Sequence, residues 1–139
     1  MWRCPACRRL FANTNQSHTC GRYTLEAHFE NKPPNIRQLY DLAAAAIEAC
    51  GPVIVLPEKT RIAFQVRMSF AQLTPKRGWI DGHVVLARRL ESPRFTKIET
   101  FSPRNHLHAF RISDPRDVDA QFKAWVKEAY AVGEQRHLD

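Results

Sequence analysis

The sequence predicts an α+β protein in which a small N-terminal zinc ribbon or knuckle precedes an antiparallel sheet of about five strands. Apolar and polar residues alternate over 61–70, which is typical of a half-buried strand. Apolar residues recur at helical spacing over 34–50 and 115–133, which indicates amphipathic helices toward both ends of the chain. Three of the four cysteines fall within residues 1–22. We therefore expect a metal-stapled module, followed by a sheet whose one face is covered by both helices.

The length of 139 residues fits one domain with a small appended module. We place the zinc-binding module at 1–22 and the α+β domain at 23–139. A composition of 44% hydrophobic and 25% charged residues is typical of globular proteins. The apolar run 42–47 is far shorter than the roughly 20 residues of a membrane span, and no signal peptide is recognisable. We expect a cytoplasmic protein with no membrane partner.

Two helical elements are expected to follow the module. Thr24 is suited to cap a short helical turn over 25–29, and the run 32–34, Lys-Pro-Pro, ends that turn and begins a second helix. The second helix should extend to about Cys50, because Gly51 and Pro52 supply a left-handed cap and a stop. Its buried face is expected to comprise Ile36, Leu39, Tyr40, Ala43, Ile47 and Cys50.

The strands of the sheet are expected at 53–56, 61–70, 79–86, 96–101 and 106–112, separated by segments rich in proline and glycine. Every even-numbered residue from Ile62 to Phe70 is apolar, so these side chains should face the core while Arg61, Gln65 and Arg67 face outward. Asp114 is expected to cap a final helix with Pro115 in its first turn. Its apolar stripe is Val118, Phe122, Trp125, Ala129 and Tyr130.

Two short pairs of soft ligands occur in the N-terminal module. Cys4 and Cys7 are separated by two residues, and His18 and Cys20 by one. Zinc prefers four nitrogen or sulfur ligands in a tetrahedron, and small ribbons deliver them as two such pairs. We expect one structural Zn²⁺ per chain, held by Cys4, Cys7, His18 and Cys20. With four protein ligands the metal has no open position for water, so we do not expect zinc catalysis.

Other interpretations of these residues remain open. Cys4 and Cys7 could form a redox dithiol, although such a motif usually follows a strand and opens a helix. His28 is an alternative fourth zinc ligand, because a helical histidine soon after Cys20 can fold back onto the metal. Cys50 is most simply a small residue of the core.

The chain is basic, with 21 Lys and Arg against 14 Asp and Glu and a net charge of +7. This excess lies mainly in 1–22 and 58–112, and it favours an acidic partner. We expect a binding protein that contacts nucleic acid. The alternative is that the basic surface only keeps the protein soluble. Phe101 is the one aromatic residue expected to face outward from a strand, so the contacts should be to phosphate more than to bases. The expected contact residues are Arg3, Arg8, Arg9, Arg61, Arg67 and Arg111.

A second functional hypothesis is a pocket for an anionic small molecule, either bound or acted on by an enzyme. His106 and His108 share the predicted core face of the last strand, where they either fill space or line a pocket. No nucleophile motif, phosphate loop or carboxylate pair accompanies them, so we favour binding over catalysis. A protein–protein adaptor is a third hypothesis. The pocket would comprise Lys59, Arg94, Ser102, Arg104, His106 and His108.

Nearly the whole chain resembles a bacterial family known as domain of unknown function 5655, in the form with a zinc-binding N-terminus. Relatives that lack the cysteines keep a segment like that at His28, which implies that His28 serves the main domain and that His18 completes the zinc site. The resemblance implies no activity. It rests on Cys4-Pro5-x-Cys7, His18-x-Cys20, His28-Phe29-x-x-Lys32-Pro33-Pro34, Lys59-Thr60-Arg61-Ile62, Leu90-Glu91-Ser92-Pro93-Arg94-Phe95, Ser102-Pro103-Arg104-Asn105-His106 and Glu128-Ala129-Tyr130-x-x-Gly133-Glu134-Gln135.

Overall fold

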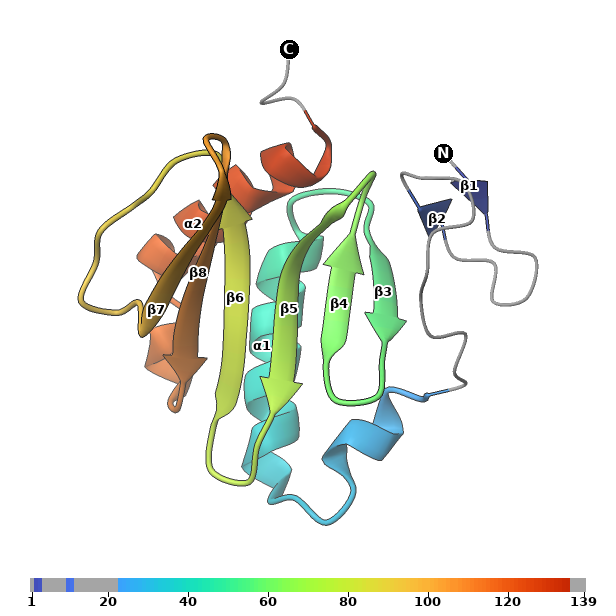
Figure 1. The fold of residues 1–139 in the computed structure, drawn as a ribbon. Coiled ribbons are helices and arrows are strands. Elements are labelled where there is room, and N and C mark those ends of the chain that lie inside the picture. The colour runs from blue at the N-terminus through green and yellow to red at the C-terminus, as the bar shows by residue number, and fades with distance from the viewer. Residues whose placement is uncertain (1, 4–9, 12–22, 136–139) are drawn as a thin grey trace.

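A computed structural model of the chain describes residues 2–3, 10–11 and 23–135 (Figure 1). Within these residues the fold is α+β, with an antiparallel sheet of six strands in the order β3-β4-β5-β6-β8-β7. Both α-helices lie behind this sheet in Figure 1, on one face, as the sequence predicts. The elements are β1 (Trp2–Arg3), β2 (Leu10–Phe11), η1 (Glu26–Phe29), α1 (Pro34–Glu48), β3 (Ile54–Pro57), β4 (Ile62–Gln65), β5 (Ser69–Pro75), β6 (Ile80–Leu86), β7 (Lys97–Ser102), β8 (Asn105–Ile112), η2 (Pro115–Asp117) and α2 (Ala120–Gly133).

The N-terminal strands β1 and β2 pair with each other in antiparallel fashion. The expected zinc ligands Cys4, Cys7, His18 and Cys20 lie outside the described residues. The zinc ribbon therefore stays a prediction. In the described part of the chain, no helix is long and apolar enough to span a bilayer.

The single strand expected over 61–70 is wrong, because the chain reverses between β4 and β5. The Val66 amide donates to the carbonyl of Met68 at 3.2 Å, which closes the turn. The amides of Arg67 and Met68 both donate to the carbonyl of Gly133, at 2.9 and 3.1 Å. Val66 and Met68 thus lie in a turn held by the end of α2. The sheet has six strands instead of about five, because the regular alternation of apolar residues continues through this turn and gives no sign of it.

The helix expected from Asp114 is also interrupted. Asp114 caps the short 3-10 turn η2, where its carboxylate accepts a hydrogen bond from the amide of Arg116 at 2.9 Å. Asp119 has extended backbone angles and caps α2 by accepting from the amide of Phe122 at 2.9 Å. Two consecutive aspartate caps therefore replace the single one predicted.

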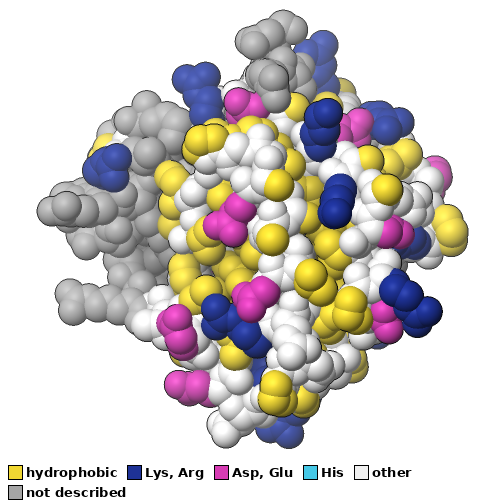
Figure 2. All heavy atoms as spheres, turned by 180° about the vertical axis from the view of Figure 1, so that it is seen from behind, with side chains coloured by type: hydrophobic (Ala, Val, Ile, Leu, Met, Phe, Trp, Pro, Cys, Tyr) yellow, Lys and Arg dark blue, Asp and Glu magenta, His cyan; other side chains and the backbone are white. Residues whose placement is uncertain are grey.

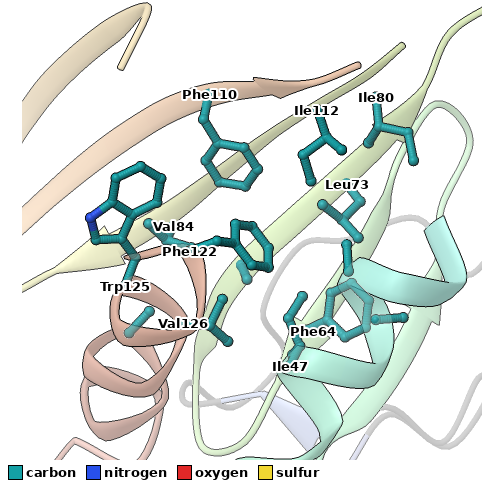
Figure 3. Close-up of a cluster of buried hydrophobic side chains, with 14 of the residues drawn as sticks. Ile47, Phe64, Leu73, Ile80, Val84, Phe110, Ile112, Phe122, Trp125 and Val126 are labelled. Atoms are coloured by element: carbon teal, nitrogen blue, oxygen red, sulfur yellow. The ribbon is translucent and has the colours of Figure 1, made fainter. Parts of the chain in front are cut away.

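The core lies between the inner face of the sheet and the two helices (Figure 3). α1 contributes Ile47, α2 contributes Phe122 and Trp125, and the strands meet them from the other side. The rings of Phe110 and Phe122 lie edge to face with centroids 5.4 Å apart, a favourable aromatic geometry. The sheet residues of this cluster include Phe64, Leu73, Ile80, Val84, Phe110 and Ile112.

Two glycines occupy positions where a side chain would strain the backbone or overlap a neighbour. Gly51 follows α1 with a φ of 147°, which residues with a side chain rarely adopt. Gly133 packs so closely on the buried Phe70 that a Cβ at this position would lie 2.6 Å from the ring atom Cδ1. The absent side chain allows the end of α2 to reach the β4–β5 turn.

Candidate functional site

A cleft with a volume of about 280 Å³ opens at the end of the sheet where the β3–β4 and β5–β6 turns lie. The short helix η1 lies beside the β3–β4 turn at this end of the sheet (Figure 1). We call this feature the lysine cleft. Its lining residues are Tyr23, Ala27, His28, Lys32, Glu58, Lys59, Thr60, Thr74, Pro75 and Lys76.

The η1 wall of the cleft is fixed by local bonds and by packing on α1. The hydroxyl of Thr24 accepts from the amide of Ala27 at 3.2 Å, as the sequence predicts for a capping threonine. The ring of Phe29 packs on that of Tyr40 with centroids 5.2 Å apart, and the guanidinium of Arg37 lies 4.9 Å from the Phe29 ring. Phe29 therefore attaches η1 to the main domain.

His28 is a buried member of the cleft wall. Its imidazole lies near the backbone of Glu58, so η1 faces the β3–β4 turn here. Burial lowers the pKa of His28, the Glu58 backbone tends to raise it, and the Lys32 charge adds to the effect of burial, so the imidazole is neutral near pH 7. The Lys32 ammonium donates to the His28 carbonyl, which holds the positive charge at the cleft.

The charge around the cleft is predominantly positive. Lys59 and Lys76 are exposed on the two turns, and neither ammonium has a hydrogen bond or ion pair with another described residue. Glu58 is the one carboxylate among the described residues of the lining, and it pairs with Arg61 at 3.3 Å. Three ammonium groups from three segments, Lys32, Lys59 and Lys76, therefore converge on one cavity, an arrangement suited to an anion.

No metal centre is found in the part of the chain that the structure describes, where no three His, Cys, Asp or Glu residues are grouped to hold an ion. His28 is the one member of the predicted zinc set within it, and it is buried in the wall of the lysine cleft. Cys50 is half-buried at the C-terminal end of α1, and its thiol donates to the Ala46 carbonyl at 3.6 Å.

The arginines expected to contact nucleic acid have different surroundings. Arg8 and Arg9 lie outside the described residues, and Arg3 is exposed on β1. Arg61 pairs with Glu58, and Arg67 is exposed in the β4–β5 turn instead of on a strand. Arg111 does lie on the outer face of the sheet, but it pairs with Asp81 at 3.2 Å and covers the Trp79 ring at 4.3 Å. Acidic partners thus reduce the charge of this face.

The six residues of the predicted pocket do not form one site. Lys59 lies in the lysine cleft, beside the end of β5 that pairs with Ile80. His106 pairs with Leu86, at the other end of β6, and Ser102 and Arg104 flank the β7–β8 turn there. Both ring nitrogens of His106 are bonded, Nδ1 to the Thr100 hydroxyl at 2.9 Å and Nε2 to the Pro103 carbonyl at 3.0 Å. These bonds stabilise the turn.

His108 and Arg94 hold the loop 87–96 against the domain. His108 is fully buried, and its Nε2 accepts from the amide of Leu90 at 2.9 Å while Nδ1 donates to the His106 carbonyl at 3.0 Å. Burial lowers the pKa of His108, in keeping with a neutral ring that accepts at Nε2. The Arg94 guanidinium bonds both carboxylate oxygens of Asp119 at 3.0 Å and lies 4.8 Å from the Trp125 ring.

Sequence reasoning missed most of the cleft. Lys32 and Lys76 were assigned only to turns, and Tyr23, Thr60 and Thr74 to no site. The available signal was a pair of lysine-bearing turns, 58–61 and 76–79, that lie at one end of the sheet once β4 and β5 are separate strands. Merging these strands into one placed the two turns at opposite ends.

Comparison with protein families identifies the domain. The family model described as "Domain of unknown function (DUF5655)" matches residues 25–133, which include every residue of the lysine cleft except Tyr23. No curated protein and no solved structure matches the chain. Because the family model covers most of the sequence, the chain belongs to the DUF5655 family.

Proposed function

We propose that this domain binds a phosphate-bearing ligand in the lysine cleft and does not catalyse a reaction there. The observation that supports the proposal is the convergence of Lys32, Lys59 and Lys76 on one cavity. Lys59 and Lys76 have no acidic partner among the described residues, so their charges are available to a ligand. Lysine ammonium groups bind phosphate as point charges.

The polar groups between the lysines suit phosphate recognition. Thr60 and Thr74 line the same cavity, and threonine hydroxyls are able to donate to phosphate oxygens. Among the described residues that line the cavity there is no cysteine or serine nucleophile and no pair of carboxylates, and burial lowers the pKa of His28. These features favour binding over acid–base or nucleophilic chemistry.

The phosphate belongs either to a small molecule or to a nucleic acid backbone. Titration of the full-length protein with inorganic pyrophosphate and with single- and double-stranded oligonucleotides, each at several salt concentrations, separates these sources. If the ligand is a nucleic acid, the logarithm of the binding constant should fall linearly with the logarithm of the salt concentration. The slope is set by the number of phosphates that the protein neutralises. A small-molecule ligand requires saturable pyrophosphate binding, with oligonucleotides bound no more tightly than pyrophosphate.

The double variant K59A/K76A tests the cleft directly. We expect it to weaken binding of whichever probe binds by at least about tenfold, because two of the three cleft charges are removed. The matched control K123A/K127A removes the same charge from α2, on the helical side of the sheet, and should bind like the wild type. Equal affinity of K59A/K76A and wild type, or no binding of any probe at low salt, would contradict the proposal.

We also propose one structural Zn²⁺ per chain at Cys4, Cys7, His18 and Cys20. The support is the ligand spacing together with the environment of His28, whose side chain is already buried in the main domain. Elemental analysis of the purified protein tests this proposal. We expect about one zinc per chain. A protein that is free of zinc after expression in zinc-supplemented medium would contradict the proposal.

A further inference from the structure

The helical side of the molecule carries an apolar groove of about 630 Å³ between α1 and α2. Figure 2 shows this side, with hydrophobic atoms in the hollow between charged groups. Leu42 lines the groove with 44% of its surface exposed, a large fraction for an apolar side chain. Such a surface usually contacts another molecule. The groove is lined by Leu42, Ala45, Ala46, Ala49, Cys50, Val118, Lys123 and Lys127.

The two helices carry different charges beside the groove. On the α2 side stand Lys123 and Lys127, both exposed and without an ion pair to any described residue. On the exposed side of α1 stand Asp41 and Glu48, of which Asp41 also pairs with Arg37 at 3.0 Å. In Figure 2 acidic side chains lie along one margin of the hydrophobic hollow, with basic side chains next to them, and basic side chains lie along the other margin.

We propose that the groove is occupied by a second copy of this chain, in a two-fold symmetric dimer. A face-to-face dimer of this type has its two-fold axis in the plane of the interface. An axis along the groove places α1 of one protomer over α2 of its partner, whereas an axis across the groove places α1 over α1 and α2 over α2. The first arrangement sets acids against lysines twice, and the second sets like charges together. Charge complementarity therefore selects the dimer in which α1 covers the partner's α2.

Sedimentation velocity of the full-length protein over about a hundredfold range of concentration tests the proposal, because the dimer fraction must rise with concentration. The reversal K123E/K127E makes both helices acidic, and D41K/E48K makes both basic. Each variant alone should dissociate, with a dimer dissociation constant weakened by about a hundredfold, because like charges then face each other.

The decisive measurement mixes the two reversed variants. In the mixed pair, acidic α1 faces basic α2 and basic α1 faces acidic α2, so we expect association to return to about the wild-type level. This rescue also excludes misfolding as the cause of dissociation. The matched control K59E/K76E changes the net charge equally in the lysine cleft and should remain dimeric.

Three outcomes would overturn the proposal: a wild-type protein that is monomeric at every concentration, reversed variants that stay dimeric, or a mixture that stays monomeric. Failure of D41K/E48K alone to dissociate the dimer would mean that α1 does not meet the partner's α2. A wild-type monomer that binds an added acidic helical peptide through the lysines would assign the groove to a foreign partner instead.

Discussion

At the scale of single residues, the two buried histidines of β8 use their ring nitrogens to hold loops by hydrogen bonds. Period-two alternation correctly places His106 and His108 on the core face, where both are buried. Their hydrogen-bond partners were not predictable, because the Leu90 amide and the Pro103 carbonyl belong to loops. Side-chain direction follows from strand geometry, whereas the bonding role of a histidine depends on tertiary contacts.

The contact of Gly133 with Phe70 leads to a stability prediction. We expect Gly133→Ala to lower the free energy of unfolding by about 1–3 kcal/mol, because the added methyl group overlaps a ring with no room to move. Gly78→Ala is the control, since a Cβ at Gly78 would have no neighbour within 4 Å. We expect it to change stability by less than about 1 kcal/mol. Urea denaturation of both variants checks the difference, and equal losses would contradict the overlap.

A third histidine, His83, leads to a pH prediction. Burial lowers its pKa from 6.5 to about 4, and the Arg61 charge adds to the effect while Glu99 opposes it. As the pH falls below 6.5, the unfolded chain gains a proton here that the folded protein does not accept until about pH 4. The free energy of unfolding should therefore decrease over this window.

The variant His83→Gln should reduce that loss, because glutamine does not titrate. Urea denaturation of both proteins at pH 7 and pH 5 measures the change in stability for each. Since the prediction concerns the difference between the two pH values, an overall destabilisation by the variant does not affect it. Identical pH dependence in both proteins would show that His83 titrates normally.

At the scale of elements, the loop 87–96 depends on Arg94. We expect Arg94→Ala to destabilise the protein by about 1–3 kcal/mol, because its bonds to Asp119 and its contact with Trp125 are lost together. Hydrogen exchange should increase at the Leu90 amide, which the same loop presents to His108. Arg88→Ala is the control, as it removes only an exposed pair with Glu128 and should cost less than about 1 kcal/mol. Unchanged exchange in Arg94→Ala would contradict a holding role.

The β4–β5 reversal explains what the sequence could predict at this scale. The apolar alternation from Ile62 to Phe70 identifies strand structure, and Ile62, Phe64 and Phe70 are all buried as expected. The turn at 66–68 contains neither glycine nor proline, and it is closed partly by Gly133, far away in the sequence. Because one missed reversal inverts the direction of the next strand, the same error hid the proximity of Lys59 and Lys76.

At the scale of the whole molecule, the helices and the sheet they cover were predictable from periodicity, while the site was not. Among the described residues, the core cluster draws on residues from Ile36 to Tyr130. The cleft combines η1 with two separate turns, and no local pattern in the sequence records that combination. Convergence of distant turns depends on the register of every intervening strand.

The composition of the described core leads to a prediction about the cysteines. We expect Cys4→Ser to remove bound zinc yet leave a cooperative unfolding transition of the main domain, because the core that the described residues form is built from residues after Tyr23. Cys50→Ser should keep the zinc and cost about 1 kcal/mol or less, since the half-buried thiol bonds only the Ala46 carbonyl. Zinc content and thermal unfolding check both variants, and equal metal content would contradict the zinc assignment.

The position of α2 in the chain has a consequence for biosynthesis. Every strand of the six-stranded sheet is translated before α2, yet α2 supplies Phe122, Trp125 and Val126 to the centre of the core. A nascent chain with a finished sheet therefore exposes Phe110 and its neighbours to water until α2 leaves the ribosome. We expect the chain to be open to chaperones that recognise apolar surface during that interval, and slow translation across residues 113–133 to prolong it.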